Sequence, residues 1–149
     1  MGTQQILLIV LSVIIVGVAI VVGITMFRNQ AINSNAQALA AEATNMRTEV
    51  VQFFKIPLDQ GGGGGTPTTA TIAAFQTKLG LDTDGKIRKD NIGDFQVTLT
   101  ATQNTATIGA LGVEKKGSDS PTFLVSFDVV SGDVIGTATA GFGTDIPTP

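Results

Sequence analysis

Three aspartates in one short segment are the residues whose type and spacing come closest to known site chemistry. Asp82 and Asp84 stand just before Gly85, and Asp90 follows in the same stretch. Carboxylates separated by one residue and followed by a glycine occur in the middle of calcium-binding loops, where their oxygens surround the ion. When the segment is aligned on Gly85, however, the first ligand position falls on a glycine and the last on an asparagine. The pattern therefore favours an acidic turn, with Asp82, Asp84 and Asp90 retained as candidate metal ligands.

Composition excludes most other site chemistry. The 149 residues contain no His, Cys, Trp or Tyr, which removes the usual zinc ligands, thiolate and histidine-dependent nucleophiles, and disulfide bonds. Ser118, Asp119 and Ser120 stand together, but no base accompanies their hydroxyl groups. Nine Lys and Arg are scattered among twelve Asp and Glu, so no basic stripe for nucleic acid is present. We expect no enzyme, no cofactor and no nucleic-acid partner.

Five consecutive glycines, Gly61–Gly65, raise the question of a phosphate-binding loop. A phosphate-binding loop also needs a following Lys-Ser/Thr pair between a strand and a helix, and these are missing here. The plainer interpretation is a flexible hinge. We expect a Gly-rich linker over residues 58–67 that separates an N-terminal helix, residues 1–57, from a head, residues 68–149.

The elements that must carry any function begin with an apolar segment, Ile6 to Phe27, which runs for twenty-two residues without a charge. As a helix it spans about 33 Å, close to the thickness of a bilayer core. In lipid a helix is required, because it satisfies every backbone group within one segment. A cleaved secretory signal is the alternative, but the segment is longer than usual, no Lys or Arg precedes it, and no A-x-A site closes it.

The helix is expected to continue to Lys55, with an amphipathic part over residues 28–55 that ends before Pro57. The rod would be about 75 Å long, so lipid or copies of itself must cover its apolar part. The residues expected to pack in that shared core are Ile6, Ile9, Val10, Val13, Val16, Gly17, Ile20, Gly23 and Phe27. Apolar residues at steps of three and four are expected to pack on the head: Ile32, Leu39, Ala43, Met46, Val50 and Phe53.

The head reads as one short helix followed by strands. Residues 69–79 show helical spacing, and Gly80 is placed to end that helix. Four runs of strand-like alternation follow, at residues 95–101, 105–113, 122–130 and 134–142, joined by short turns. Short links favour an antiparallel meander. The predicted fold class is therefore α+β, a long N-terminal hydrophobic helix followed by a small antiparallel β-sheet head.

An apolar start, an Ala-rich amphipathic continuation, a glycine-rich stretch and a small β-rich head together resemble a type IV pilin or a related archaeal filament subunit. The resemblance implies that N-terminal helices bundle in a filament core with the heads outside. It implies as partners further copies of the chain, the membrane before assembly, a pilus assembly machinery and a prepilin peptidase. It also implies insertion in the cytoplasmic membrane and then an extracellular filament on the cell surface, with adhesion, motility and DNA uptake as open roles.

The sequence departs from the bacterial pattern at its start. Bacterial pilins usually begin with Phe and carry an acidic residue a few places later, whereas this chain has Met1 and offers only Gln4 and Gln5. The expected mature start lies at Gly2 to Gln5, either after trimming or with Met1 as the true start. The alternative to a filament subunit is a single-pass membrane-anchored surface protein that does not polymerise. Conduction along a filament has little support, because the only aromatic residues are eight Phe.

Overall fold

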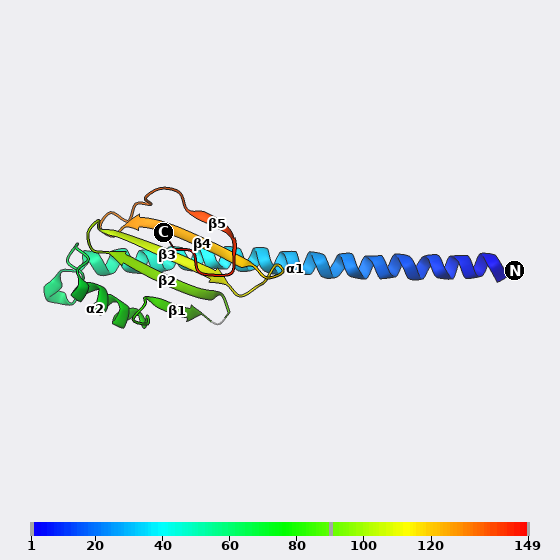
Figure 1. Cartoon of the computed structure of the whole chain (residues 1–149), viewed down its shortest axis with the longest axis horizontal. Coiled ribbons are helices and arrows are strands. Elements are labelled where there is room, and N and C mark those ends of the chain that lie inside the picture. The colour runs from blue at the N-terminus through cyan, green and yellow to red at the C-terminus, as the bar shows by residue number, and fades with distance from the viewer. Residues whose placement is uncertain (1, 90, 149) are drawn as a thin grey trace.

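The computed structural model describes residues 2–89 and 91–148. It confirms the α+β fold, a long apolar N-terminal helix followed by an antiparallel sheet (Figure 1). The elements in chain order are α1 (Gly2–Lys55), the 3₁₀ turn η1 (Leu58–Gln60), α2 (Thr69–Leu79), β1 (Lys86–Lys89), β2 (Gly93–Thr100), β3 (Thr105–Gly112), β4 (Ser120–Asp128) and β5 (Thr139–Gly143).

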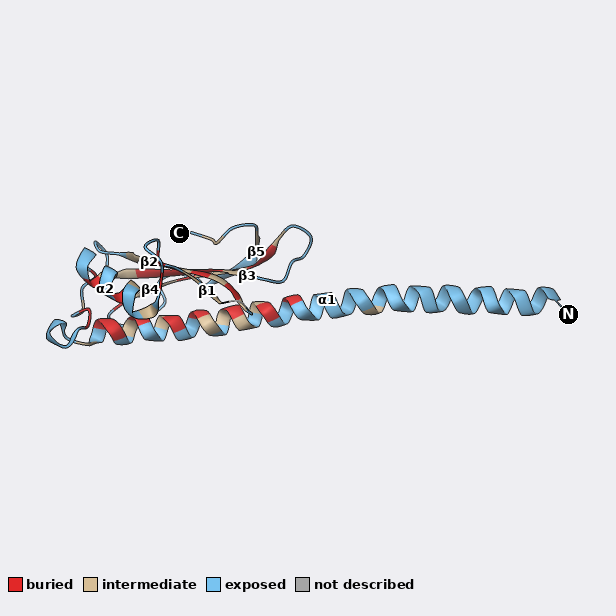
Figure 2. Ribbon diagram, turned by 90° about the horizontal axis from the view of Figure 1, so that it is seen from below, coloured by how far each residue is buried: buried red, intermediate tan, exposed pale blue. Residues whose placement is uncertain are grey.

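Helix α1 is one continuous rod of 54 residues, about 81 Å long. Its C-terminal half lies along the sheet, and its N-terminal half projects beyond the head (Figure 1). Burial divides at the same place, because buried positions appear on α1 only from Ile32 onward (Figure 2). The C-terminal half of α1 packs on the sheet and is amphipathic, whereas the N-terminal half is exposed and mostly apolar.

The sheet is an antiparallel meander in the order β1-β2-β3-β4-β5. The central strands β3 and β4 pair in register from Thr105 opposite Asp128 to Leu111 opposite Thr122, and both strands contact α1. Alternate apolar side chains of the sheet are buried in one core with α1: Phe95, Val97, Ala106, Ile108, Ala110, Val125 and Phe127. The C-terminal segment crosses β3 at Gly109, beside Ile146 and Pro147.

Three phenylalanines join α1 and α2 at the far end of the head. The ring centroids of Phe53 and Phe75 are 5.4 Å apart, and those of Phe53 and Phe54 are 5.3 Å apart. Helix α2 begins at a capping box formed by Thr68 and Thr71 and ends at Gly80, whose left-handed backbone closes it. This helix has the predicted bounds and carries Phe75 into the core.

The structure differs from the sequence prediction in two strands. Strand β1 was not predicted, because the sequence Lys-Ile-Arg-Lys lacks strand-like alternation of apolar residues. It lies at the edge of the sheet, where long basic side chains are common because they discourage further pairing. The predicted strand over residues 134–142 is shorter. Val134 makes only an isolated bridge to Phe127, and β5 begins at Thr139.

The glycine run forms a packed turn in place of the expected flexible hinge. The amide of Gly63 donates to the carbonyl of Phe53 at 2.9 Å, and that of Gly65 donates to the carbonyl of Phe54 at 2.8 Å. A Cβ on Gly63 would overlap the Phe54 ring. At Gly62, Gly63 and Gly64 a Cβ would overlap the chain at the end of α1 or Leu58, whereas Gly61 and Gly65 have open space but a positive φ.

Candidate assembly surface on the projecting helix

The projecting half of α1, defined here as residues 2–31, is exposed on all sides, and its uncharged segment from Ile6 to Phe27 is apolar around the whole helix. Every side chain larger than alanine in this half is exposed, and the large apolar ones range from 49% exposed at Leu11 to 74% at Phe27. The most apolar 18-residue window of the helix contains no buried residue. By length and composition the helix is able to cross a membrane.

The two hydroxyl groups in the apolar segment of this surface are satisfied within the helix. Ser12 Oγ donates to the carbonyl of Ile9 at 2.8 Å, and Thr25 Oγ1 donates to the carbonyl of Val21 at 2.9 Å. Both residues therefore present little unsatisfied polarity to their surroundings. The segment suits a medium that offers dispersion contacts and no hydrogen bonds, namely lipid or other apolar helices.

The residues expected to pack in a filament core all lie in this half. At about 100° per residue these nine positions fall within an arc of about 140° and form one stripe along the helix. The exposed apolar residues outside the set, such as Leu8 and Ile15, cover the other sides. The exposed set with large side chains is Ile6, Ile9, Val10, Val13, Val16, Ile20 and Phe27. Gly17 and Gly23 have open space where a Cβ would stand. A single neighbour would cover only one side, so complete burial requires several.

The residues expected to pack on the head lie on the opposite half of the rod, facing the sheet. All six are buried: Ile32, Leu39, Ala43, Met46, Val50 and Phe53. Their steps of three, four or seven residues keep one face of the helix on the sheet over about six turns. The head therefore covers this face completely and leaves the projecting half uncovered.

Two polar residues of α1 that the sequence analysis did not single out also hold the head. Asn35 is 7% exposed, and its Nδ2 donates to the carbonyl of Ile92 at 2.8 Å. Its only signal in the sequence is its place between Ile32 and Leu39 on the apolar stripe. Arg47 Nη2 donates to the carbonyl of Gly132, which fixes the turn after β4 against the helix.

That turn is organised by Asp128. Its carboxylate accepts hydrogen bonds from the backbone amides of Val130 and Ser131, each at 2.8 Å. The bonds from Ser131 and then Val130 hold the pKa of the Asp128 carboxyl below its ordinary value, because they favour the charged form. The turn therefore takes its shape from an ionised side chain.

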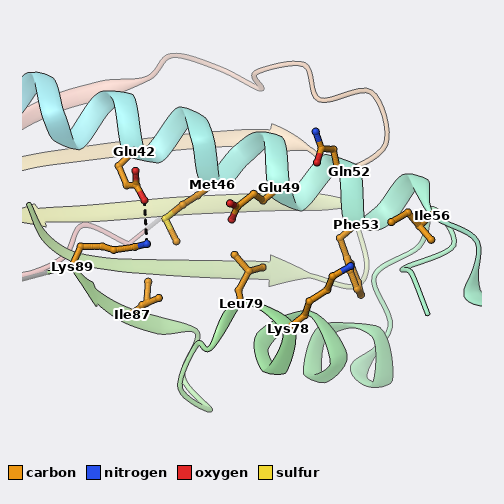
Figure 3. A pocket seen from close by; sticks show the side chains of 10 residues that line it. All are labelled: Glu42, Met46, Glu49, Gln52, Phe53, Ile56, Lys78, Leu79, Ile87 and Lys89. Atoms are coloured by element: carbon orange, nitrogen blue, oxygen red, sulfur yellow. Dashed lines mark ion pairs between the residues drawn. The ribbon is translucent and has the colours of Figure 1, made fainter. Parts of the chain in front are cut away.

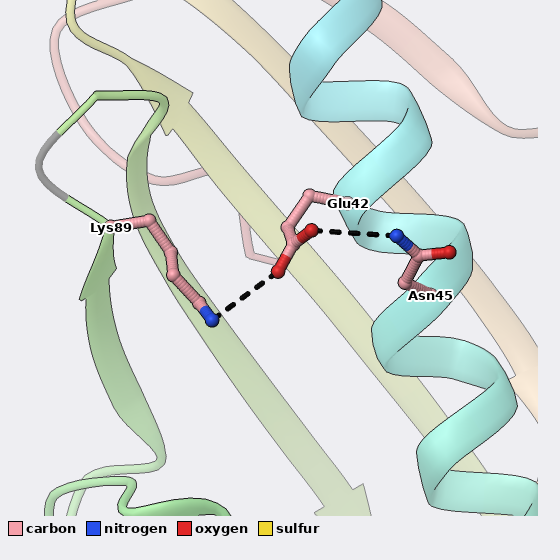
Figure 4. Close-up of polar contacts among 3 residues, drawn as sticks. All are labelled: Glu42, Asn45 and Lys89. Carbon is pink, nitrogen blue, oxygen red and sulfur yellow. Dashed lines mark hydrogen bonds and ion pairs between the residues drawn. The ribbon is translucent and has the colours of Figure 1, made fainter.

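A groove of about 450 Å³ lies between α1, α2 and β1. Figure 3 shows the charged side chains that surround it. Glu42 accepts from Lys89 in an ion pair of 3.4 Å, and Lys78 Nζ lies 5.3 Å from the centre of the Phe53 ring. Glu42 also accepts from Asn45 at 3.5 Å (Figure 4). These contacts tie β1 and α2 to α1, and exposed pairs of this kind contribute little stability.

The acidic segment forms a turn before β1. The amide of Gly85 donates to the carbonyl of Asp82 at 2.8 Å, and the amide of Thr83 donates to the Asp82 carboxylate at 2.7 Å. Asp84 is exposed nearby, whereas Asp90 lies outside the described residues. Within residues 2–89 and 91–148, no group of three or more His, Cys, Asp or Glu is placed to hold a metal ion.

Comparison with models of protein families, with curated proteins and with solved structures finds no match to this chain. The likeness to pilins therefore rests on architecture, a long apolar N-terminal helix joined to a small antiparallel sheet. The geometry defines one candidate site, the apolar surface of residues 2–31.

Proposed function

We propose that this protein is a structural subunit of an extracellular helical filament of the type IV pilus kind. In the filament, the projecting halves of α1 form a shared core and the heads lie outside it. The role is structural and involves no catalysis. The observation that carries the proposal is the projecting half itself, an all-round apolar helix that the head leaves exposed.

The opposite face of the C-terminal half of α1 supports a packed bundle. Exposed positions there include the small side chains of Ser34, Ala41, Thr44 and Thr48. The hydroxyl groups of Thr44 and Thr48 donate to carbonyls of their own helix, at 2.8 and 3.0 Å. Small side chains whose hydroxyl groups are satisfied within their own helix allow close approach of another helix. A neighbour's projecting half is a suitable occupant for this face.

Such a contact is heterologous, because the projecting half of one copy meets a different surface of the next. A repeated heterologous contact that does not close into a ring produces a helical filament. Before assembly the same apolar surface is held in the cytoplasmic membrane. We propose that a prepilin peptidase and a membrane assembly machinery process and extract the subunit from there.

The test is electron microscopy of material sheared from cells that express the full chain, together with N-terminal sequencing of the subunit. We expect thin filaments of uniform width that contain this protein and a subunit that begins within the first few residues of the chain. If the protein stays in the membrane fraction and extracts into detergent as a monomer, the proposal is wrong. That outcome favours a membrane-anchored surface protein that does not polymerise.

A further inference from the structure

The loop between β3 and β4, residues 113–119, lies beside the base of the projecting half. It is the part of the head that reaches furthest along α1 toward the N-terminus (Figure 1). Val113 and Lys115 share a surface hollow with Phe27, Arg28 and Ile32 of α1. A hydrogen bond to α1 holds the loop in this place: the Glu114 amide donates to Asn35 Oδ1 at 3.5 Å.

If α1 is inserted in a membrane, it leaves the apolar core of the bilayer near Phe27 and Arg28, beside this loop. Arg28 is the first charged residue of the chain, and the uncharged apolar segment ends at Phe27. From Phe27 to Ile32 the helix rises about 7.5 Å. The headgroup layer on each side of a bilayer core is about 5–8 Å thick. If the apolar segment spans the bilayer, the β3–β4 loop lies at the depth of the lipid headgroups.

The side chains at this level suit an anionic membrane surface. Arg28, Lys115 and Lys116 are exposed and outnumber the acidic groups of the same region, Glu114 and Asp119. Val113 is 46% exposed and adds apolar area next to the cations. Basic side chains beside exposed apolar groups bind at lipid interfaces, where the cations meet phosphates and the apolar groups enter the boundary layer.

We propose that the β3–β4 loop docks on anionic phospholipid headgroups while α1 spans the bilayer. The end of the head next to the projecting half then rests on the membrane surface. This inference rests on the membrane-inserted stage of the proposed function. It adds a defined orientation to that stage, with the loop at the lipid surface and the turn between β2 and β3 at the opposite end of the head.

The absence of cysteine from the sequence makes site-specific labelling straightforward. Single variants Val113→Cys, Ala101→Cys and Val16→Cys carry an environment-sensitive fluorophore on the loop, at the opposite end of the head and in the projecting half. Each labelled full-length chain is reconstituted into vesicles of phosphatidylcholine alone or of equal parts phosphatidylcholine and phosphatidylglycerol. A headgroup-attached quencher then reports which labels lie at the membrane.

We expect the label at position 113 to be more blue-shifted and more strongly quenched in the anionic vesicles than in phosphatidylcholine alone, and we expect high salt to remove this difference. The label at position 101 should stay in water in both. Lys115→Gln with Lys116→Gln should abolish the shift at position 113. Lys115→Gln alone, which preserves the contact of Lys116 with the Phe142 ring, should weaken it.

A label at position 113 that stays in water in both kinds of vesicle, while the label at position 16 is buried in lipid, would overturn the docking proposal alone. Equal burial of position 113 with and without anionic lipid would overturn its electrostatic basis. A label at position 16 that remains in water would contradict docking and the membrane-inserted stage together. The filament itself is judged separately by electron microscopy.

Discussion

Asn35 fixes where α1 lies along the sheet, because it is a polar residue in an otherwise apolar contact face. Its amide supplies the donor for the carbonyl of Ile92, and its oxygen faces Gly112. A Cβ on Gly112 would overlap Asn35 Oδ1, so the glycine permits the helix to approach. Apolar contacts alone tolerate a sliding helix, whereas these hydrogen bonds exist in one register only.

We expect Asn35→Ala to lower the free energy of unfolding by about 1–3 kcal/mol. The Ile92 carbonyl loses the nearer of its two donors and keeps the Val113 amide at 3.3 Å, and the Glu114 amide loses its acceptor. The matched control is Asn33→Ala, an exposed position on the same helix, which should change it by less than about 0.5 kcal/mol. Calorimetry of the full chain in detergent micelles provides the measurement. Equal effects of the two substitutions would contradict the role given to Asn35.

Through Asp128, in the turn after β4, the stability of the head depends on pH. Its folded-state pKa is depressed by the amides of Ser131 and Val130, so its contribution is present above the ordinary carboxyl pKa of about 4 and is lost as pH falls through the lower folded-state value. Asp128→Asn removes that dependence. The melting temperature of the unsubstituted chain should exceed that of the variant at neutral pH, and the difference should shrink in acid. A constant difference across pH would show that the charge is not responsible.

At the scale of elements, the sequence predicts helices and strands that have regular apolar spacing, and it does not predict those that depend on contacts with distant residues. Helix α2 was predicted with its observed bounds because its apolar spacing and terminal Gly80 agree with each other. Strand β1 is not predicted from the sequence, because an edge strand needs no alternation of apolar side chains. Five glycines in a row predict a hinge, because glycine gives the unfolded chain the greatest conformational freedom. The packed turn depends instead on hydrogen bonds to the end of α1, which composition does not show. Asn35 and Arg47 were missed for a related reason, since their backbone partners lie far away in sequence.

The packed turn leads to a prediction that a flexible linker would not. A Cβ on Gly62 would overlap the Ile56 carbonyl oxygen, whereas a Cβ on Gly61 meets nothing within 4 Å. Gly62→Ala should therefore destabilise the head by about 1–3 kcal/mol through overpacking against backbone. Gly61→Ala, limited to the strain of its φ of +78°, should cost about 1–2 kcal/mol. Hydrogen exchange at the end of α1 should increase in the Gly62 variant, and an unchanged pattern would support a free linker.

At the scale of the whole molecule, folding of the head and assembly use different halves of one helix. The residues buried against the sheet begin at Ile32, and the large side chains of the described part of α1 before that point stay exposed. A substitution in the projecting half therefore leaves the core of the head intact. This separation allows a defect in assembly to be distinguished from a defect in folding, which is difficult in proteins whose interfaces share the core.

Val13 provides the sharpest test of that separation. It is 64% exposed in the middle of the projecting half, and Val13→Asp places a charge where neighbouring helices would meet. One aspartate at the centre of a membrane helix costs about 3 kcal/mol, and the surrounding Ile, Val and Leu each contribute about −0.3 to −0.6 kcal/mol, so insertion should persist. In a dry helical bundle the charge has no partner, and filaments should be lost. Val16→Asp should behave in the same way.

The matched control is Thr98→Asp, which places the same charge at an exposed position of β2 and should leave filament yield unchanged. Filaments are counted by electron microscopy, membrane insertion is measured by fractionation, and folding of the head is measured by calorimetry. Normal filaments from either substitution in the projecting half would contradict a core role for that half. Loss of filaments with insertion and head folding retained would locate the defect after insertion, in extraction of the helix from the membrane or in contacts between copies.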